Sequence, residues 1–321
     1  MTDLEKKELE SHQTAVKSWW NSENTKEKWQ GTTYQPQFET HLHYWIRQEK
    51  TLKFLDELEL PKESKILELG YGGAETAQAI LERGYTYYGL DISGHLCEHA
   101  KKKCFSYVEK NKAFFYEKSL EEKFDFNDNF FDVVIICGAI HYAGNLTNSF
   151  LEVKRVLKKN GKYIIGQGNM YTLNDLLKPR KLLKSIIWFI TREEFQYSYS
   201  LSFRDMLLET KLKKFFIKFQ NTKFLNSKFM TKYSNTWKYK IHKRMFSDRS
   251  MKKIIEKNDF KIIDVYGGPF LYSSDENKSM IKSFINNFLQ KLLDKKIFKF
   301  LIKVSDNFIY MSEPNNTSKE K

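Results

Sequence analysis

The chain has 321 residues, 41% of them hydrophobic, which is enough for one large or two modest domains with a buried core. A short binding peptide or a disordered chain is therefore excluded. The longest wholly apolar runs, such as Val133–Cys137 and Ile186–Ile190, have five residues each, far fewer than the roughly 20 that cross a bilayer. The acidic, polar start MTDLEKKELES lacks the basic and apolar stretches of a secretory leader, so we expect a cytoplasmic protein.

The net charge of +14 is concentrated in one region. The range Tyr171–Ser250 contains 18 Lys and Arg and 6 Asp and Glu, a net +12, which leaves +2 for the rest of the chain. Lysine outnumbers arginine 46 to 8, a skew that codon bias can produce without any ligand. Two explanations of the basic region therefore stay open, codon bias and an anionic surface.

Two helices are predicted within the first 62 residues. Ser11–Trp29 and Phe38–Leu60 carry aromatic and leucine side chains at helical spacing, and Pro61 ends the second segment. The stretch GTTYQPQ between them, which contains Tyr34, is predicted to be irregular. Residues 1–62 are therefore expected to form an N-terminal helical unit.

From Lys65 onward, short apolar runs alternate with amphipathic stretches. The runs KILELG, YTYYGLD, AFFYE, FDVVIICGA and KYIIGQG are each followed by a loop and usually by a helical pattern. Strands that alternate with helices form right-handed βαβ units and a parallel sheet. The Asn160-Gly161 pair before the last run is predicted to stop the preceding helix with a left-handed backbone. Residues 63–170 are therefore predicted to form an α/β core.

The alternation is interrupted after Met170. Residues 171–250 are rich in Lys, Phe and Tyr and are predicted to be a mostly helical insertion that builds a lid or a substrate wall. Two further strands, FKIIDVYGG and DNFIYMSEP, flank a helical region from Lys278 to Val304, so residues 251–314 are assigned to the remainder of the sheet. Residues 315–321 are predicted to be a disordered tail.

The first chemical signal is the loop Glu68-Leu69-Gly70-Tyr71-Gly72-Gly73-Ala74, which follows a predicted strand and precedes a helix. Such a loop lets the backbone approach a ligand closely, with free helix N–H groups directed at it. A dinucleotide site requires G-x-G-x-x-G, but Glu75 occupies the third glycine position and would face the pyrophosphate. Asp91 ends the next strand, where a carboxylate can accept both hydroxyls of a ribose. Glycines also mark ordinary turns, but the combination favours a nucleoside ligand.

These residues resemble the motifs of class I S-adenosylmethionine-dependent methyltransferases, specifically the small-molecule group that includes the ubiquinone-type methyltransferases. ILELGYGGAETAQAI is similar to their first motif, with Glu68, Gly70 and Gly72 matching and Ala74 in place of the last glycine. GLDIS, FFDVVIICGAIHYAGN and LEVKRVLKKNGKYIIG resemble their second-, fourth- and fifth-strand motifs. The resemblance implies a Rossmann-like, mostly parallel seven-stranded sheet with an N-terminal helical lid, a basic helical insertion after the fifth strand and DNFIYMSEP as the antiparallel strand.

The resemblance also implies S-adenosylmethionine as the cofactor and gives roles to individual residues. The methionine portion would be held by Glu68, Gly70, Tyr71, Gly72 and Gly73, the ribose by Asp91, and the adenine by Ile92, Ser119 and Leu120, while Cys137, Gly138 and Ala139 would lie under the sulfonium. At Ser119 the family often has an acidic residue that reaches the adenine amino group, so this chain departs from the pattern there. Tyr34 is the candidate lid residue, because the N-terminal segment of related enzymes often folds over the cofactor.

Such a cofactor carries an activated methyl group, so the enzyme mainly aligns the reacting atoms and excludes water, and no metal is expected. If the acceptor is a hydroxyl or a protonated amine, a base must remove its proton, and His141 after the fourth strand is the candidate. His141 could equally cap the next helix or pack under the lid. Tyr142 is a candidate for contact with the acceptor or the sulfonium, with a wall of the pocket as its other role.

No motif defines the acceptor. LLKPRKLLKSIIWFI, LKKFFIKF and FLQKLLDKKIFKFLIKV mix Lys with large apolar residues, as membrane-surface helices do, although a lid helix on the core gives the same pattern. Nucleic acid ranks third as a partner, because no RNA-binding module is recognisable and the N/DPPY signature is absent after Cys137. The sequence does not define the oligomeric state.

We therefore predict a cytoplasmic enzyme that methylates an oxygen, nitrogen or carbon of a small, lipid-linked or saccharide metabolite and docks transiently on an anionic membrane. A noncatalytic membrane-surface or interaction protein that retains the fold is the alternative, and an RNA methyltransferase ranks third.

Overall fold

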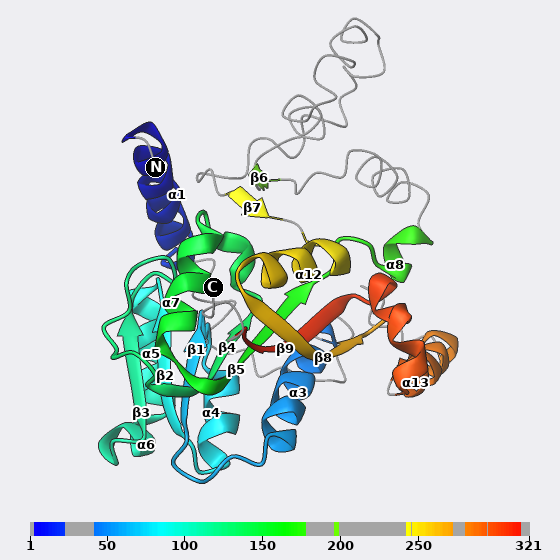
Figure 1. Cartoon of the computed structure of the whole chain (residues 1–321), viewed down its shortest axis with the longest axis horizontal. Coiled ribbons are helices and arrows are strands. Elements are labelled where there is room, and N and C mark those ends of the chain that lie inside the picture. Colours follow the sequence, from blue (N-terminus) through cyan, green and yellow to red (C-terminus); the bar gives the residue numbers. More distant parts are fainter. Residues whose placement is uncertain are drawn as a thin grey trace, which may run out of the picture.

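A seven-stranded sheet forms the centre of the molecule. The computed structural model describes residues 3–22, 42–177, 196–198, 242–244, 246–271, 280–293 and 295–315. The strand order is β3-β2-β1-β4-β5-β9-β8 (Figure 1). The bounds are β1 (Lys65–Leu69), β2 (Thr86–Asp91), β3 (Ala113–Glu117), β4 (Phe131–Cys137), β5 (Leu157–Gly168), β8 (Phe260–Gly268) and β9 (Asn307–Pro314). β1 to β5 pair in parallel, and β9 is antiparallel to β5 and β8. The predicted Rossmann-like, mostly parallel sheet is confirmed.

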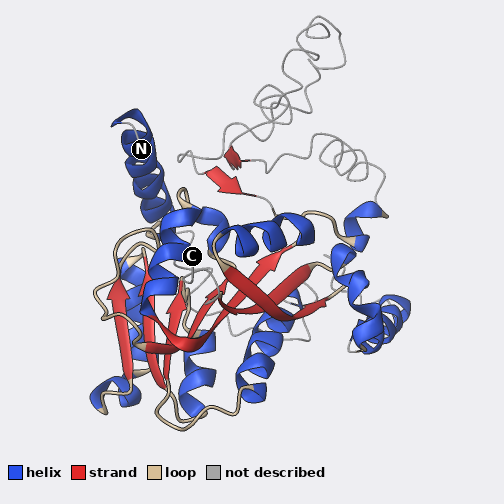
Figure 2. Cartoon of the chain, viewed as in Figure 1, coloured by secondary structure: helices blue, strands red, loops and turns tan. Residues whose placement is uncertain are grey.

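Helices cover both faces of the sheet (Figure 2). One apolar core contains Leu67 of β1 together with side chains of α7 (Leu146–Val156) and α12 (Asp248–Lys257). The other contains Ile66 together with side chains of α3 (Leu42–Glu57), α4 (Glu75–Glu82) and α5 (Gly94–Lys103). Neighbouring strand residues point to opposite faces, so Ile66 and Leu67 enter different cores. A sheet buried on both faces explains why its strands read as nearly continuous apolar runs.

The N-terminal helices differ from the prediction in their bounds and in their surroundings. α1 (Asp3–Trp20) begins before Ser11 and ends well before Trp29, while residues 23–41 lie outside the described residues. α3 packs on β5, β8 and β9, and its Phe54 and Leu55 are fully buried. The part of the predicted lid that α3 forms is therefore a layer of the core.

The predicted insertion after β5 is only partly described. β6 (Gln196–Ser198) and β7 (His242–Arg244) form a two-stranded antiparallel ribbon within a segment predicted to be mostly helical. The remaining residues 178–195, 199–241 and 245 lie outside the described residues, as do residues 316–321 of the tail. α12 runs across the expected boundary at residue 250, because Ser247 and Ser250 cap its first turn reciprocally.

Most of the described chain between β8 and β9 is helical. It contains α13 (Met280–Leu293) and the 3-10 helix η4 (Lys296–Val304). No helix in the described part of the chain is both long enough and apolar enough to cross a membrane.

Candidate active site

A cavity of about 530 Å³ lies at the carboxyl ends of β1, β2, β4 and β5. This edge is where open parallel sheets bind their ligands, and the volume is within the usual range for small-molecule sites. The predicted site residues that line it are Glu68, Gly70, Tyr71, Gly72, Asp91, Ile92, Ser119, Leu120, Cys137, Gly138, Ala139, His141 and Tyr142. The motifs that were separate in the sequence therefore meet around one space.

One described residue of the predicted site does not line the cavity. Gly73 is absent from its lining, and the Gly73 carbonyl instead accepts a hydrogen bond from Lys103 Nζ at 3.1 Å. Lys103 Nζ also lies 3.2 Å from a Glu75 carboxylate oxygen. Tyr34 lies outside the described residues.

The glycine loop takes its shape from left-handed backbone at Gly70, Gly72 and Ala74, with φ of +72°, +55° and +62°. Glycine adopts this region without the steric cost that a Cβ brings. A Cβ on Gly70 would lie 2.3 Å from Ala139 Cβ, so Gly70 is required where the loop passes the end of β4. A Cβ on Gly72 would meet no atom within 4 Å. The loop therefore leaves open space beside Gly72, on the wall of the cavity.

The Asp91 carboxylate ties the end of β2 to the glycine loop. Its Oδ2 accepts a hydrogen bond from Gly72 N at 3.1 Å, and its Oδ1 accepts one from Ser93 N at 3.0 Å. The side chain is 7% exposed, and burial raises the pKa of Asp91 to about 6 against the opposing effect of these N–H groups. Each carboxylate oxygen keeps a second acceptor site, so the group is oriented and can still bind two donors.

Glu68 is a buried carboxyl group under the same loop. Its Oε2 accepts a hydrogen bond from Tyr87 Oη at 2.8 Å, and the residue is 2% exposed. Burial raises the pKa of Glu68 to about 7, although the tyrosine hydrogen bond acts in the other direction. The folded protein therefore holds the Glu68 carboxyl group at the cavity, where its ionised form is disfavoured unless a cation pairs with it.

His141 belongs to the short helix η1 (Ile140–Tyr142) that follows β4. Its Nδ1 lies 3.2 Å from Gln167 Oε1, an atom that can only accept a hydrogen bond, so Nδ1 carries the proton. In the neutral ring the lone pair is then on Nε2. The Tyr142 ring lies against the imidazole, with 4.1 Å between ring centroids. Gln167 thus fixes both the tautomer and the orientation of His141.

Arg47 of α3 lines the cavity, although no local motif indicated it. A Cβ on Gly138 would lie 2.6 Å from Arg47 Nη2, and a Cβ on Gly166 would lie 3.1 Å from Arg47 Cγ. These two glycines therefore make room for the arginine side chain. The guanidinium lies 5.3 Å from the centre of the Tyr44 ring and forms no ion pair with any carboxylate in the described residues. A positive group with free donors is available beside the end of β4.

α1 also lines the cavity, through His12, Gln13, Val16 and Trp20. The sequence did not indicate these residues. Trp20 contacts Tyr142 edge to face, with 5.7 Å between centroids, and His12 Nε2 donates to Tyr142 O at 2.7 Å. Beyond the helix, Ser93 Oγ donates to Asn21 Oδ1 at 2.7 Å. The helix is therefore held to both sides of the cavity by specific contacts.

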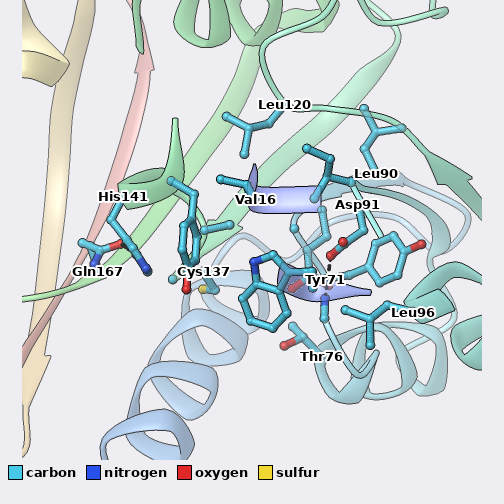
Figure 3. A pocket seen from close by; sticks show the side chains of 18 of the residues that line it. Val16, Tyr71, Thr76, Leu90, Asp91, Leu96, Leu120, Cys137, His141 and Gln167 are labelled. Carbon is cyan, nitrogen blue, oxygen red and sulfur yellow. Dashed lines mark hydrogen bonds between the residues drawn. The ribbon is translucent and has the colours of Figure 1, made fainter. Parts of the chain in front are cut away.

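The cavity has two sides in Figure 3, with Cys137 between them. We call Glu68, Gly70, Gly72, Asp91 and their neighbours up to Leu120 the loop side. The β5 side consists of His141 and Tyr142 together with residues that sequence reasoning missed, namely Gln167, Asn169, Asp306 and Asn307. Gln167 and Asn169 are each 7% exposed. Gln167 lies near the carboxyl end of the predicted strand KYIIGQG and Asn169 follows it, and this position is a signal that could have identified them.

Comparison with known proteins agrees with the methyltransferase resemblance seen in the sequence. Residues 67–165 match the model of a methyltransferase domain family. The YqeM protein of Bacillus subtilis (strain 168) is 25% identical over 157 residues, which cover 46% of this chain and 62% of that protein. The chain therefore spans less than two thirds of this relative.

Two solved structures share the fold. Magnesium protoporphyrin IX methyltransferase from Synechocystis PCC 6803, solved with bound SAH, has a TM-score of 0.53 and 13% identity, covering 94% of this chain and 99% of its own. Geranyl diphosphate C-methyltransferase from Streptomyces coelicolor A3(2) has a TM-score of 0.51 and 12% identity, covering 94% and 98%.

The resemblance noted in the sequence is confirmed. The sheet order and the cavity at its carboxyl edge are those of the class I S-adenosylmethionine-dependent methyltransferase fold, and residues 67–165 form the matching methyltransferase domain.

Proposed function

We propose that the protein transfers a methyl group from S-adenosylmethionine to a hydroxyl or amine of a small, lipid-linked or saccharide metabolite. The observation that carries this proposal is the Gln167–His141 pair beside Cys137, Gly138 and Ala139 in the cavity. A base with a defined tautomer is useful when the acceptor atom must lose a proton, whereas an acceptor without one needs only alignment. The two structural relatives are named for small-molecule substrates, which supports an acceptor of that size.

The loop side fits the cofactor. When bound, S-adenosylmethionine supplies a methyl group on a sulfonium centre. We propose that the Asp91 carboxylate accepts the two ribose hydroxyls, that Ile92, Ser119 and Leu120 border the adenine, and that the open space beside Gly72 receives the methionine portion.

Arg47 and Glu68 complete this side through their charges. Methionine carries a carboxylate and an ammonium group, and both have a complementary partner in the cavity. Arg47, with no carboxylate partner of its own in the described residues, would bind the carboxylate, since a guanidinium matches that group bidentately. Glu68 lies beneath the loop where an ammonium would offset its buried charge.

The β5 side would perform the proton transfer. His141 Nε2 accepts the acceptor's proton while Gln167 holds Nδ1–H and keeps the ring from turning. Tyr142 and Trp20 border the same space and exclude water. The methyl is thus transferred between the two sides, near Cys137.

The test uses methyl-labelled S-adenosylmethionine and extracts separated into lipid and water-soluble small-molecule fractions. Wild-type protein should transfer label into one fraction, and His141→Gln should lower transfer by about 100-fold, within the usual range for a general base, with S-adenosylhomocysteine affinity unchanged. Gln167→Leu should lower transfer less and leave cofactor affinity intact, because it affects only the orientation of His141. Cofactor binding without transfer into either fraction would contradict the proposed reaction and favour a noncatalytic protein. Methyl transfer by His141→Gln at the wild-type rate would show that His141 is not the general base.

A further inference from the structure

The inference concerns α13 and η4, which project at the edge of the molecule beyond β8 (Figure 1). Polar residues anchor the inner face of α13. Asn286 Oδ1 accepts hydrogen bonds from Phe270 N at 2.9 Å and Leu271 N at 2.7 Å, and Gln290 Nε2 donates to Gly267 O at 3.1 Å. These residues follow one side of the helix together with Leu293, which is 2% exposed.

The outer face of α13 is apolar where a surface helix is normally polar. Phe284 is 73% exposed and Phe288 is 55% exposed, and Lys291 follows on the same face at the next helical step. On the inner face, Leu289 and Leu293 pack on the core beside the two amides, so the phenylalanines of the outer face are additional apolar side chains that remain in solvent. These phenylalanines contribute little to folding.

η4 packs against α13 and exposes side chains of the same two kinds. Phe300 is 60% exposed, and Lys295 and Lys303 are exposed beside it. The range Met280–Val304 contains six lysines and one acidic residue, a net +5. Exposed phenylalanine thus coincides with a local excess of positive charge.

We propose that this surface, defined by Phe284, Phe288, Lys291, Phe300 and Lys303, docks the protein on an anionic lipid membrane. Interfacial helices combine a large apolar side chain that enters the acyl boundary with lysines that meet anionic head groups. Protein interfaces instead favour arginine and deplete lysine, so the composition fits lipid better than a protein partner. One of the three segments whose sequence suggested a membrane-surface helix, FLQKLLDKKIFKFLIKV, spans residues 288–304 and is part of this surface. The other two, within residues 171–250, are not needed for this argument.

The position of this surface connects it to the active site. η4 ends at Val304, and Asp306 and Asn307, a few residues further on, line the cavity on its β5 side. Docking through η4 would therefore bring the β5 side near the bilayer surface, where a lipid-linked acceptor resides. This last step rests on the proposed methyl transfer, whereas the docking itself does not.

The experiment is vesicle sedimentation of the full chain. Vesicles of phosphatidylcholine alone are compared with vesicles containing equal phosphatidylcholine and phosphatidylglycerol, each at low and high salt. The wild type should bind only the anionic vesicles, and high salt should weaken binding. The double variant Phe284→Ser and Phe288→Ser, and separately Lys291→Glu with Lys303→Glu, should each bind at least about tenfold more weakly.

Matched controls come from α6 (Phe105–Glu109), at the far end of the molecule in Figure 1. Phe105 is 59% exposed and Lys110 next to the helix is exposed, so Phe105→Ser and Lys110→Glu make the same chemical changes elsewhere. Both should bind vesicles like the wild type. S-adenosylhomocysteine affinity, measured on every variant, reports that the fold is retained.

Four outcomes would overturn the docking proposal. These are wild-type binding to neither vesicle, equal binding to both, unchanged binding by both α13–η4 variants, and loss of binding by the α6 controls as well. If the phenylalanine variant instead abolishes self-association or capture of a protein and leaves lipid binding intact, the surface is a protein interface. Each outcome is independent of methyl transfer, which is measured separately with labelled S-adenosylmethionine and no vesicles.

Discussion

The two sides of the cavity are built from the chain in different ways. The loop side comes from the stretch between Glu68 and Leu120, where the predicted site residues lie in the last residues of a strand or just after it. The β5 side combines residues 141–142, 167–169 and 306–307, which are far apart in sequence, and α1 and α3 complete the lining of the cavity. A binding site for an invariant ligand can be encoded by local turns, whereas the wall that meets an acceptor is assembled by tertiary packing. The following predictions test this difference.

The largest expected effect is on the loop side. Gly72→Val should weaken S-adenosylhomocysteine binding by about 100-fold or more, since a branched side chain would fill the open space beside the loop. Calorimetry measures the affinity. Gly84→Val is the matched control, because Gly84 also has positive φ, at +85°, but its Cβ would meet only Lys62. Near-normal affinity of Gly72→Val would show that the cofactor does not use this space.

Glu68→Gln separates binding from stability on the same side. Folding raises the pKa of Glu68 from 4.5 to about 7, so the native state holds the proton more tightly than the unfolded state. This contribution is fully present below about pH 4.5 and is lost as the pH rises through about 7. At about pH 8 the variant should therefore be more stable than the wild type by about 3 kcal/mol at most, at 1.36 kcal/mol per pKa unit.

Chemical denaturation at about pH 4 and about pH 8 measures the effect of Glu68→Gln. The two proteins should have similar unfolding free energies at the acidic pH, where both side chains are neutral. Cofactor affinity should fall in the same variant, as is common when a group strained for function is replaced. A stability difference that is equal at both pH values would mean that Glu68 is not the titrating group.

Arg47 lies at the boundary between the two sides. Arg47→Gln should weaken S-adenosylhomocysteine binding by about tenfold or more, because charge-assisted hydrogen bonds contribute roughly 1.5 to 3 kcal/mol. Arg83→Gln serves as the control, since Arg83 pairs with Asp56 on the surface and leaves the cavity untouched. If Arg47→Gln retains cofactor affinity and loses only methyl transfer, the arginine belongs to the β5 side and binds the acceptor.

The next prediction concerns the loss of cofactor affinity when Asp91 is replaced. Asp91→Ala should weaken cofactor affinity by at least about tenfold, and Asp91→Asn should fall between the two because it keeps one acceptor oxygen. Since burial raises the pKa of Asp91 to about 6, cofactor affinity of the wild type should also decrease as the pH falls below that value. Circular dichroism controls for folding. If the cofactor affinity of Asp91→Ala is within about twofold of the wild-type affinity, Asp91 does not bind the ribose.

The sequence was sufficient for the sheet and for the loop side for a physical reason. Strand ends that carry Glu68 and Asp91 are fixed by apolar runs, and the intervening glycine loop is local. Arg47 could not be predicted, since its place depends on Gly138, just after β4, and on Gly166 in β5. Tertiary pairing also overrode one local signal.

That signal was the helix stop at Asn160-Gly161, which was predicted with left-handed backbone. Neither residue has positive φ, and the helix ends instead at Val156, followed by Leu157 with φ −71° and ψ 138°. Leu157 already pairs with Phe131 of β4, so the sheet draws the chain into extended conformation before the pair is reached. Turn residues predict a turn only where no strand partner competes for the backbone.

The smallest expected effect concerns the cover over both sides. Lys17 of α1 forms an ion pair with Glu117 at the end of β3, at 2.5 Å, but the two side chains are 50% and 43% exposed. Exposed pairs contribute about 0 to 1 kcal/mol, so Lys17→Ala should change cofactor affinity by about twofold. Trp20→Ala removes the aromatic contact with Tyr142 over the cavity. It should lower cofactor affinity more than Lys17→Ala does, because that contact excludes water. Calorimetric titration of both variants compares them directly. A larger loss from Lys17→Ala than from Trp20→Ala would mean that surface charge, rather than packing on the β5 side, holds α1 over the site.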